Sequence, residues 1–449
     1  MEAKHPAPLV IPRAEHPISR QKVSPDALKV LYRLYRNGYK AYLVGGSVRD
    51  LLLKREPKDF DIATDAHPRE VNQLFKNSRV IGRRFKVVHV HFGKDRIVEV
   101  STFRSQPEDV APDANKEEEA AEAAAEEETE EEDDGPRRRR INENTFGTEQ
   151  EDALRRDLTI NGLFYDIGTF SIIDYVGGLR DLHQGVIRII GDPKERLEED
   201  PVRIIRAIRH AARTDFTIEP ATAKAIRDAH QLLPTCAPAR VFEEFLRELR
   251  GGYAYESFRR MCEMEVLKTL YPQLAAHLGK APRKDPEPGS PWFLLESVDR
   301  LRAERGPVPD SILLGVILAS MLRSPIDAAC ETEATKAEVS QRIEKLRRSA
   351  DAVLTDMGIP RKIAGAVVGH LVGLSRVRRA LMMQNLGPSV RGKSYFADAY
   401  ATYEIDAIAR GEMPVDPEHL TLVANQRANR RKSSKRGPRR RKKKAAKAQ

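Results

Sequence analysis

The segment that decides the fold is Leu43-Val-Gly-Gly-Ser-Val-Arg-Asp50, which is followed shortly by Asp59-Phe-Asp61. A short apolar run leads into the two glycines, and a helical pattern follows them. A strand that ends in two glycines and opens a helix lets backbone N–H groups approach a phosphate, because no side chain blocks the way. Arg49, in the first turn of the helix, adds a positive charge. The segment therefore predicts a phosphate-binding turn.

The two aspartates that follow predict a metal site. Residues 60–64 are typical of a strand, and side chains at i and i+2 of a strand lie on one face, roughly 6–7 Å apart. Asp59 and Asp61 would then face one way while Phe60 and Ile62 face the core. Two carboxylates this close repel each other unless a cation such as Mg²⁺ or Mn²⁺ neutralises them, and Mg²⁺ prefers carboxylate and phosphate oxygens. A pair of such ions activates an attacking hydroxyl and stabilises a leaving pyrophosphate. The alternative is an exposed Asp-x-Asp turn.

A third carboxylate is usual in such a site, and two candidates remain open. Glu99 alternates with Val98 and Val100 in a predicted strand, so its side chain would face away from the buried pair. Asp157 follows two arginines, which would either lower its pKa or be oriented by it. Glu99 also fits an edge-strand surface acid, and Asp157 also fits a structural ion pair.

The sequence patterns divide the chain into five parts. Ser24-Pro25 predicts the start of the first helix, and strand patterns recur at residues 41–44, 60–64, 84–92 and 96–101. Strings of acidic residues with alanine between them bury too little apolar surface to become ordered. We therefore predict a flexible leader (1–23), an α+β head (24–195) with an acidic insertion at about 105–144, a helical neck (196–275), a helical body (276–425) and a disordered basic tail (426–449).

Charge is distributed unevenly along the chain. The formal net charge is +10, from 77 Lys and Arg against 67 Asp and Glu. Twelve acids lie between Glu117 and Asp134, and thirteen bases lie between Arg427 and Gln449. A basic tail of this kind indicates contact with the phosphates of RNA, with little sequence preference. It also fits a partner-binding arm that reaches an RNA-degradation complex or an acidic lipid surface.

Composition argues against several classes of protein. The three cysteines, Cys236, Cys262 and Cys330, cannot form a disulfide framework and lack metal-ligand spacing, which indicates a reducing compartment. The longest apolar run, Ser311 to Leu322, is about half of a membrane span. No signal pattern precedes Ser24. We expect a cytoplasmic protein without a transmembrane segment.

Five motifs occur in order along the chain: Gly45-Gly-Ser-Val-Arg-Asp50, Asp59-x-Asp61, Arg155-Arg-Asp-Leu-Thr-Ile-Asn161, Tyr175-Val-Gly-Gly-Leu-Arg-Asp181 and Glu199-Asp-Pro-Val-Arg203. Together they resemble the class II nucleotidyltransferases, the family of bacterial poly(A) polymerases and tRNA CCA-adding enzymes. The likeness covers roughly Val10 to Leu270. Residues 81–90, the leader and the basic tail are more similar to the polymerases. Two positions depart from the family pattern: His210 stands where Phe is usual, and Gly162 replaces Ser or Ala.

The resemblance implies a fold and a set of roles. The fold would be a polymerase-β-like head, with a small mixed sheet and helices, followed by a mostly helical neck, body and tail. The triphosphate of the nucleotide would be held by Gly45, Gly46 and Arg49. The acidic active-site residues would be Asp59, Asp61 and Asp157, the first two binding metal. The sugar and phosphates would meet Arg155, Arg156 and Asn161. The base-recognition element would be Glu199, Asp200, Arg203 and Arg206.

The residue pattern agrees with such a base-recognition element. Arg203, Arg206, Arg209 and Arg213 recur at helical spacing, opposite an apolar stripe. Adenine presents an amino donor and a ring-nitrogen acceptor, so a carboxylate accepts from the first and a guanidinium donates to the second. Asp200 and Arg203 offer these two groups, although cytosine offers a similar pair. Asp200 before Pro201 also fits a helix N-cap alone.

We therefore expect an enzyme that adds AMP from ATP to RNA 3′ ends without a template, releases pyrophosphate and promotes RNA processing and decay. One alternative is CCA addition to tRNA, which the base-recognition residues do not distinguish from poly(A) addition. The other is an RNA-binding protein without catalysis, against which the intact pair Asp59 and Asp61 argues.

Overall fold

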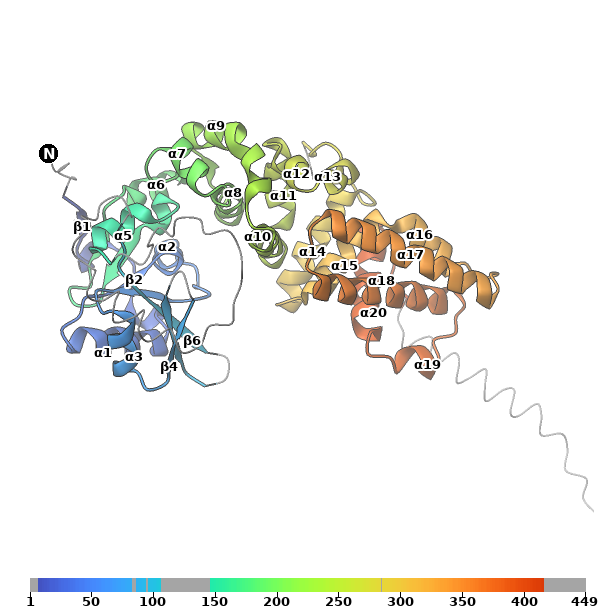
Figure 1. Cartoon of the computed structure of the whole chain (residues 1–449), viewed down its shortest axis with the longest axis horizontal. Helices are drawn as coiled ribbons and strands as arrows, with labels where there is room; N and C mark the ends of the chain where they lie inside the picture. Colours follow the sequence, from blue (N-terminus) through green and yellow to red (C-terminus); the bar gives the residue numbers. More distant parts are fainter. Residues whose placement is uncertain (1–6, 83–85, 94–95, 106–145, 284, 416–449) are drawn as a thin grey trace, which may run out of the picture. The chain divides into compact units, whose positions relative to one another are not determined.

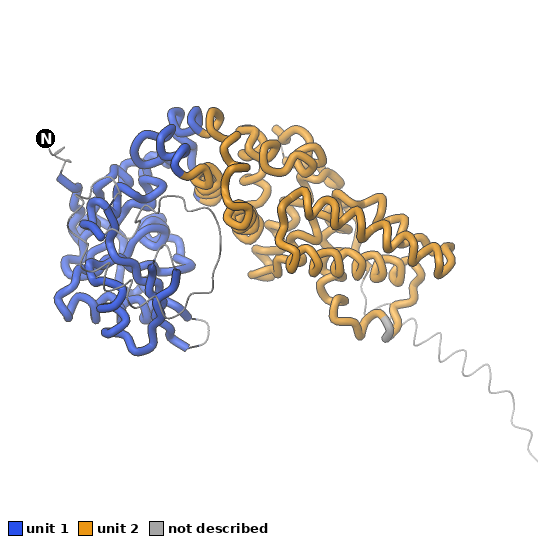
Figure 2. Tube along the Cα trace, viewed as in Figure 1, with its two compact units in different colours: residues 1–199, 214–225 blue, residues 200–213, 226–449 orange. Residues whose placement is uncertain are grey.

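The computed structural model describes residues 7–82, 86–93, 96–105, 146–283 and 285–415. The chain forms two compact units: residues 1–199 and 214–225 make unit 1, and residues 200–213 and 226–449 make unit 2 (Figure 2). The predicted acidic insertion, apart from its first residue, and the predicted basic tail lie outside the described residues.

Unit 1 is built on an eight-stranded mixed sheet with the order β1-β8-β7-β2-β3-β6-β5-β4 (Figure 1). The strands are β1 (Leu9–Ile11), β2 (Ala41–Val44), β3 (Asp61–Thr64), β4 (Ser78–Ile81), β5 (Val87–His91), β6 (Ile97–Thr102), β7 (Leu163–Asp166) and β8 (Ile172–Asp174). All neighbours are antiparallel except β3 and β6, which are parallel. The predicted α+β head with a small mixed sheet is confirmed, and the strands predicted at 84–92 and 96–101 correspond to β5 and β6, which pair as a hairpin.

Helices cover this sheet and close its ends. In unit 1 they are α1 (Pro25–Arg36), α2 (Gly46–Leu52), α3 (Pro68–Leu74), α5 (Glu149–Arg155), α6 (Gly178–Gln184) and α7 (Pro193–Glu199), with short 3-10 turns at Arg13–Glu15, Arg20–Lys22 and Thr159–Asn161. Ser24 caps α1 by accepting from the backbone N–H of Ala27, as its position before Pro25 predicts. All four residues of β2 are buried, so β2 is the centre of the core.

One face of the central strands carries an aromatic cluster. Tyr42 of β2 lies 5.8 Å from the rings of both Phe103 and Phe164, and Val44 and Ala63 complete the cluster. Ala153 of α5 belongs to the same cluster, so this packing fixes α5 on that face. The end of α5 is thereby brought close to the ends of β2 and β7.

The predicted flexible leader is wrong for the residues that the structure describes. Leu9–Ile11 form β1, which pairs with β8 at the edge of the sheet. Ile18 is fully buried, and His16 hydrogen-bonds the carbonyl oxygen of Phe170 over 2.8 Å. These partners are more than 150 residues away in sequence. The leader therefore belongs to the core of unit 1, which a reading of local composition does not reveal.

Unit 1 takes up the chain again after residue 213. A two-stranded parallel sheet joins β9 (Val186–Ile187) to β10 (Thr217–Ile218), and Arg188 pairs with Glu219 beside it. The helix α9 (Pro220–Ala229) follows, and its first residues complete unit 1. The predicted neck over 196–275 is therefore divided between the two units, because β10 pairs with a strand of the head.

Unit 2 is helical, as predicted. Its helices are α8 (Arg203–Thr214), α10 (Pro238–Arg250), α11 (Ala254–Glu263), α12 (Val266–Leu270), α13 (Pro272–Leu278), α14 (Pro291–Arg305), α15 (Asp310–Met321), α16 (Arg323–Cys330), α17 (Lys336–Asp356), α18 (Arg361–Met382), α19 (Pro388–Arg391) and α20 (Phe396–Ala409). The apolar run that contains α15 is almost entirely buried against α18 and α20. Across the described ranges no single helix has the length and apolarity to cross a membrane; the pair α15 and α16 meets the test only together, with an 89° bend between them.

Candidate active site

Strand register brings the glycine turn and the aspartates together. β2 and β3 are antiparallel, and Val44, the residue before the two glycines, lies opposite Asp61. β3 begins at Asp61, so Asp59 lies just before the strand, and both residues keep exposed surface. Ile62 is fully buried on the other face of the sheet. The turn and both carboxylates therefore lie at one end of the central strands.

Glu99 lies beside this pair of carboxylates. β6 runs parallel to β3 with Ile62 beside Val100, which places Glu99 next to Asp61 on the same face. Although part of Asp61 stays exposed, desolvation by the surrounding protein and the nearby Glu99 charge raise its pKa to about 6; Arg156 opposes the rise, and Asp59 adds to it. Glu99 therefore lies close enough for its charge to act on Asp61.

The oxygen donors fit magnesium rather than a closed metal cage. Among the residues described, no three His, Cys, Asp or Glu side chains are arranged to hold an ion by themselves. Mg²⁺ usually binds through one or two carboxylates and completes its shell with substrate phosphates and water. Asp59 and Asp61, with Glu99 beside them, match that requirement, because like charges gather there with solvent access.

Gly45 adopts a backbone conformation that suits glycine. Its φ is 69° and its ψ is −136°, a region that residues with a Cβ rarely enter. A Cβ at this position would lie 3.3 Å from Nη1 of Arg156. Gly46 is the first residue of α2. The bare backbone of the turn and the guanidinium of Arg156 therefore border the same space.

Arg49 is placed differently from the prediction. The sequence suggested a contact with the triphosphate, but the Arg49 side chain is fully buried. Its Nε donates to Asp50 over 2.9 Å, and its Nη1 donates to Oδ1 of Asn161 over 2.7 Å. With no exposed surface, Arg49 supports the glycine turn from inside the protein. Asn161 is also buried and donates to Oδ1 of Asp157 over 3.3 Å.

Asp157 is held by local hydrogen bonds. Its Oδ1 accepts from the backbone N–H of Leu158 over 2.8 Å as well as from Asn161. Asp157 is therefore connected to Asp50 by a series of hydrogen bonds through Arg49 and Asn161. This series fixes the carboxylate of Asp157 relative to α2.

Arg155 and Arg156 lie at the end of α5, and the structure adds a third arginine that the sequence reasoning missed. Arg156 is braced by Asp152 over 2.9 Å and lies over the ring of Phe164. Burial lowers the pKa of Arg104, and the neighbouring Arg155 charge lowers it further. Arg104 is therefore close to Arg155. Its position just after β6, the strand of Glu99, is the signal that could have found it.

Arg196 is a second residue that sequence reasoning missed. It is buried in α7, and its Nη2 donates to the backbone carbonyl oxygens of Arg155 and Arg156 over 2.7 and 3.2 Å. This contact holds the segment that carries the two arginines. No sequence motif pointed to Arg196, because its partners lie 40 residues away.

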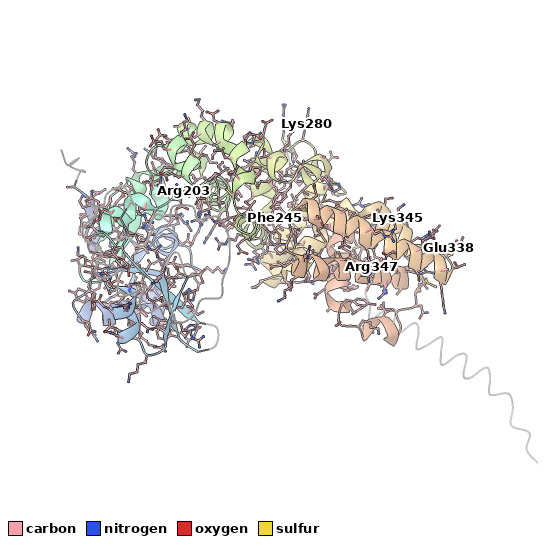
Figure 3. All side chains as sticks on the ribbon, viewed as in Figure 1. Arg203, Phe245, Lys280, Glu338, Lys345 and Arg347 are labelled. Atoms are coloured by element: carbon pink, nitrogen blue, oxygen red, sulfur yellow. The ribbon has the colours of Figure 1, made fainter. Side chains whose placement is uncertain are left out.

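The predicted base-recognition residues Asp200, Arg203 and Arg206 lie in unit 2. In α8 every residue from Ile204 to Ala212 is buried except Arg206 and Arg209, and Arg203, labelled in Figure 3, is also half-buried. The predicted amphipathic pattern is therefore confirmed. Asp200 does not cap α8, because its Oδ2 accepts from Arg240 over 2.9 Å and its buried Oδ1 has no hydrogen-bond partner among the described residues. The N-cap alternative is wrong.

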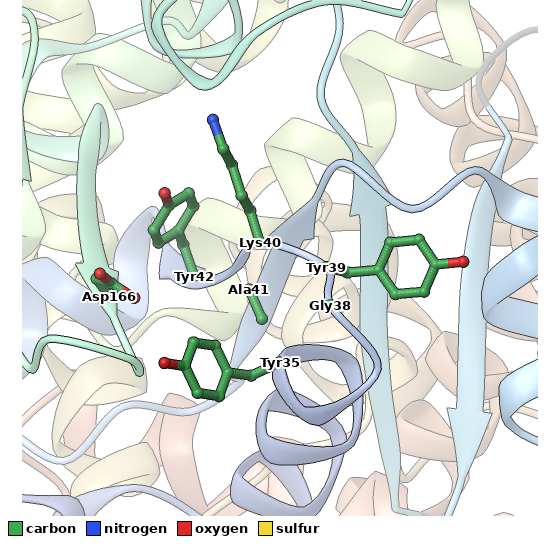
Figure 4. A pocket seen from close by; sticks show the side chains of 7 residues that line it. All are labelled: Tyr35, Gly38, Tyr39, Lys40, Ala41, Tyr42 and Asp166. Atoms are coloured by element: carbon green, nitrogen blue, oxygen red, sulfur yellow. The ribbon is translucent and has the colours of Figure 1, made fainter.

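A separate cavity of about 450 Å³ lies at the start of β2, away from the aspartates. Its lining is Tyr35, Gly38, Tyr39, Lys40, Ala41, Tyr42 and Asp166. Figure 4 shows the hydroxyls of Tyr35 and Tyr42 on the side of Asp166, while Tyr39 points the other way. Lys40 pairs with Glu149, and Tyr39 donates to Glu70. None of the predicted nucleotide-binding residues lines this cavity.

Comparison with known proteins assigns the two regions to described families. Residues 41–188 match the poly A polymerase head domain, and residues 215–278 match a region described as a probable RNA and SrmB-binding site of polymerase A. The chain is 45% identical to poly(A) polymerase I of Escherichia coli O157:H7 over 272 residues, 61% of this chain and 55% of that protein. It is 35% identical to the CCA-adding enzyme of Bacillus pumilus over 277 residues, 61% of each chain.

Solved structures share the fold. A tRNA nucleotidyltransferase bound to a primer tRNA and an incoming ATP analogue superposes with a TM-score of 0.53 at 21% identity, covering 90% of this chain and 99% of that one. The chain spans about half the length of the poly(A) polymerases that it matches. By its head domain and by these relatives, the chain is similar to the poly(A) polymerases over its head, and also to the CCA-adding enzymes.

Proposed function

We propose that the chain is an RNA nucleotidyltransferase that adds AMP from ATP to RNA 3′ ends without a template. The observation that carries this proposal is the group formed by Asp59, Asp61 and Glu99 opposite the Gly45 turn. In the reaction, the RNA 3′-hydroxyl attacks the α-phosphorus of ATP, a new phosphodiester bond forms, and the bond to the β-phosphate breaks, which releases pyrophosphate.

The residues of this site divide the work by charge. Asp59 and Asp61 bind Mg²⁺, which when bound neutralises charge on the phosphates and activates the attacking hydroxyl. The glycine turn lets the triphosphate approach the backbone, and Arg156 supplies a cation beside it. The third carboxylate in this proposal is Glu99, since the strand register places it beside Asp61 and its charge acts on Asp61. Asp157, Asn161 and Arg49 position the turn from within.

Selection of adenine rests on Asp200 and Arg203. The partner-free Oδ1 of Asp200 is an acceptor for the adenine amino group, and Arg203 offers donors to the ring nitrogen. Addition of A alone, rather than CCA, is supported by the higher identity to the poly(A) polymerases, 45% against 35% for the CCA-adding enzyme. CCA addition to tRNA is the alternative.

The setting of the reaction is part of the proposal. We place the protein in the cytoplasm, acting on RNA 3′ ends in RNA processing and decay, with residues 426–449 binding RNA or an RNA-degradation complex. All three cysteines are free thiols, which agrees with a reducing compartment.

The deciding experiment supplies each nucleotide separately to the purified chain with Mg²⁺, using an RNA primer and a tRNA that lacks its CCA end. Long products with ATP alone support the proposal. Two C residues followed by one A and a halt would establish CCA addition instead. RNA binding without incorporation of any nucleotide would support the alternative of an RNA-binding protein without catalysis.

The metal-binding role is tested by replacing both aspartates, Asp59→Asn with Asp61→Asn. Incorporation should vanish while RNA binding, measured by gel shift, persists. Asp65→Asn is the matched control, because Asp65 lies just after the other end of β3 and accepts only from the Lys40 backbone among the contacts seen. Unchanged incorporation by the double variant would eliminate the metal-binding role.

A further inference from the structure

The helix α10 contacts the base-recognition residues of unit 2 through its charged side chains. Nη2 of Arg240 lies 2.9 Å from Oδ2 of Asp200. The other oxygen of that carboxylate, Oδ1, is buried and has no hydrogen-bond partner among the described residues. Arg240 therefore decides which Asp200 oxygen is engaged and which is left to accept a further donor.

One turn later on α10, Glu244 holds the arginines of α8. Glu244 is 6% exposed, and its carboxylate accepts from Nη1 of Arg209 and lies 3.7 Å from Nη1 of Arg206. Arg247 also donates to it, over 2.9 Å. The contacts of three guanidinium groups with one buried carboxylate fix the positions of these groups. Glu244 thus holds the guanidinium groups of Arg206 and Arg209 on α8.

The spacing on α10 makes these contacts a single face. Arg240, Glu244 and Glu248 are four residues apart, so they follow one another along the same side of the helix. Glu248 continues the series, with an oxygen 3.8 Å from Nη1 of Arg209. This charged face follows the course of α8.

The adjacent apolar face of α10 is fixed in the core of unit 2. Phe245, labelled in Figure 3, is 1% exposed, and its ring lies 4.7 Å from that of Tyr271 and 5.6 Å from that of Phe258. Val241 and Leu249 are buried on the same side. α10 therefore presents its charged face from a rigid support.

We propose that Arg240 and Glu244 are positioning residues that set nucleotide selectivity: Arg240 orients the Asp200 carboxylate so that Oδ1 reads the base, and Glu244 holds Arg206 and Arg209 in place beside it. This inference rests on the proposed function, because it assumes that Asp200 reads the base. Neither α10 residue needs to touch the nucleotide.

The test compares ATP with inosine triphosphate, which replaces the adenine amino group by a carbonyl. Asp200 Oδ1 accepts from the amino group and repels the carbonyl, so the ratio of kcat/KM values for the two nucleotides measures the reading by Asp200. Arg240→Met, which removes the charge at an exposed position, should lower this ratio by roughly tenfold, mainly through a higher KM for ATP. Arg240→Lys should recover part of the ratio. Glu244→Gln should lower it as well.

Glu243→Gln is the matched control, since Glu243 is the adjacent acid on α10 and pairs with Arg247 and Arg250 rather than with α8. It should keep the wild-type ratio. The inference is overturned if Arg240→Met and Glu244→Gln are folded and keep the wild-type ratio, even with lower kcat. It is also overturned if Glu243→Gln changes the ratio as much as they do.

Failure of the inference and failure of the proposed function look different. If the wild-type chain incorporates AMP and the Asp200→Ala variant loses the preference for ATP, but the α10 variants do not, the inference alone fails. If the wild-type chain incorporates no nucleotide, the proposed function fails and the inference fails with it.

Discussion

Nη1 of Arg49 donates to Oδ1 of Asn161 over 2.7 Å, which joins two segments that are 112 residues apart in sequence. Both side chains are buried, and the side-chain amide of Asn161 also donates a hydrogen bond to Oδ1 of Asp157. Buried side chains therefore hold the glycine turn and the motif at residues 155–161 together. This contact does not depend on a bound nucleotide.

Asn161→Ala should destabilise unit 1, because it removes an acceptor from a buried guanidinium. We expect the free energy of unfolding to fall by about 1–3 kcal/mol. Urea denaturation measures this change. Asn37→Ala is the control, since the amide of Asn37 donates to the Arg33 carbonyl at an exposed site and its loss should cost no more than about 0.5 kcal/mol. Equal stability of the two variants would contradict the role of the Arg49 contact.

Gly45→Ala should raise the KM for ATP. The new Cβ would occupy an unfavourable backbone region and lie 3.3 Å from Nη1 of Arg156, so the guanidinium must shift. Gly38→Ala carries the matched strain, with φ of 90° but no atom within 4 Å of the new Cβ. Both variants should lose about 1–3 kcal/mol of stability. Only Gly45→Ala should change the KM for ATP, measured by steady-state incorporation. An unchanged KM would show that Arg156 does not bind the triphosphate.

Glu248→Gln should make the chain more stable at pH 8 than the wild type. Burial raises the pKa of Glu248 from 4.5 to about 7, although the neighbouring Arg209 charge opposes the shift. Because the pKa of Glu248 is higher in the folded protein, its neutral carboxyl group favours the folded state. This contribution to the free energy of unfolding is fully present below about pH 4.5 and is lost as the pH rises to about 7. Glutamine stays neutral throughout, so the gain over wild type should grow by roughly 1–3 kcal/mol between pH 5 and pH 8.

Urea denaturation at the two pH values checks this prediction. Comparing each variant with wild type at the same pH removes the titration of all other groups. Glu243→Gln, at an exposed site on the same helix, should show no such pH dependence. A gain for Glu248→Gln that is the same at both pH values would show that its carboxyl group does not titrate in this range.

Cys236 should react slowly with thiol reagents, and its modification should impair nucleotide incorporation. Burial raises the pKa of the Cys236 thiol, and the nearby Asp200 charge raises it further, so little thiolate exists at pH 7. A bulky maleimide on Cys236 would lie near Asp200, the carboxylate that is proposed to read the base. Incorporation by the alkylated protein measures the effect, and Cys236→Ser should be resistant. Full activity after complete labelling would show that a bulky group on Cys236 does not disturb the function of Asp200.

Local patterns predicted much of the fold. The cap at Ser24, the strand that leads into Gly45 and the arginine stripe of α8 were all correct, because each depends on residues within a few positions of one another. The sequence placed the two aspartates shortly after the glycine turn. The pairing of Val44 with Asp61, which brings them together across the connection that contains α2, is seen only in the structure.

Contacts between distant residues were not predictable in this way. The burial of Arg49 depends on Asn161, and the order in the leader depends on Phe170. The family motif at 175–181 has a packing role in this structure: Asp181 is buried and accepts from Thr159, and a Cβ at Gly178 would lie 2.1 Å from the Thr159 carbonyl oxygen. A sequence motif indicates that a residue is important. The contacts of that residue in the structure show whether it serves catalysis or packing.

The path of the chain through the two units has a consequence for how the protein is made. The chain leaves unit 1 after residue 199, forms most of α8 in unit 2, and returns to unit 1 at residues 214–225. During synthesis the head can therefore not complete its fold when residue 199 emerges from the ribosome, because β10 has not yet been made to pair with β9. The helix α8 must emerge first, so the head and the helix that carries the proposed base-recognition residues complete their folding together rather than in succession.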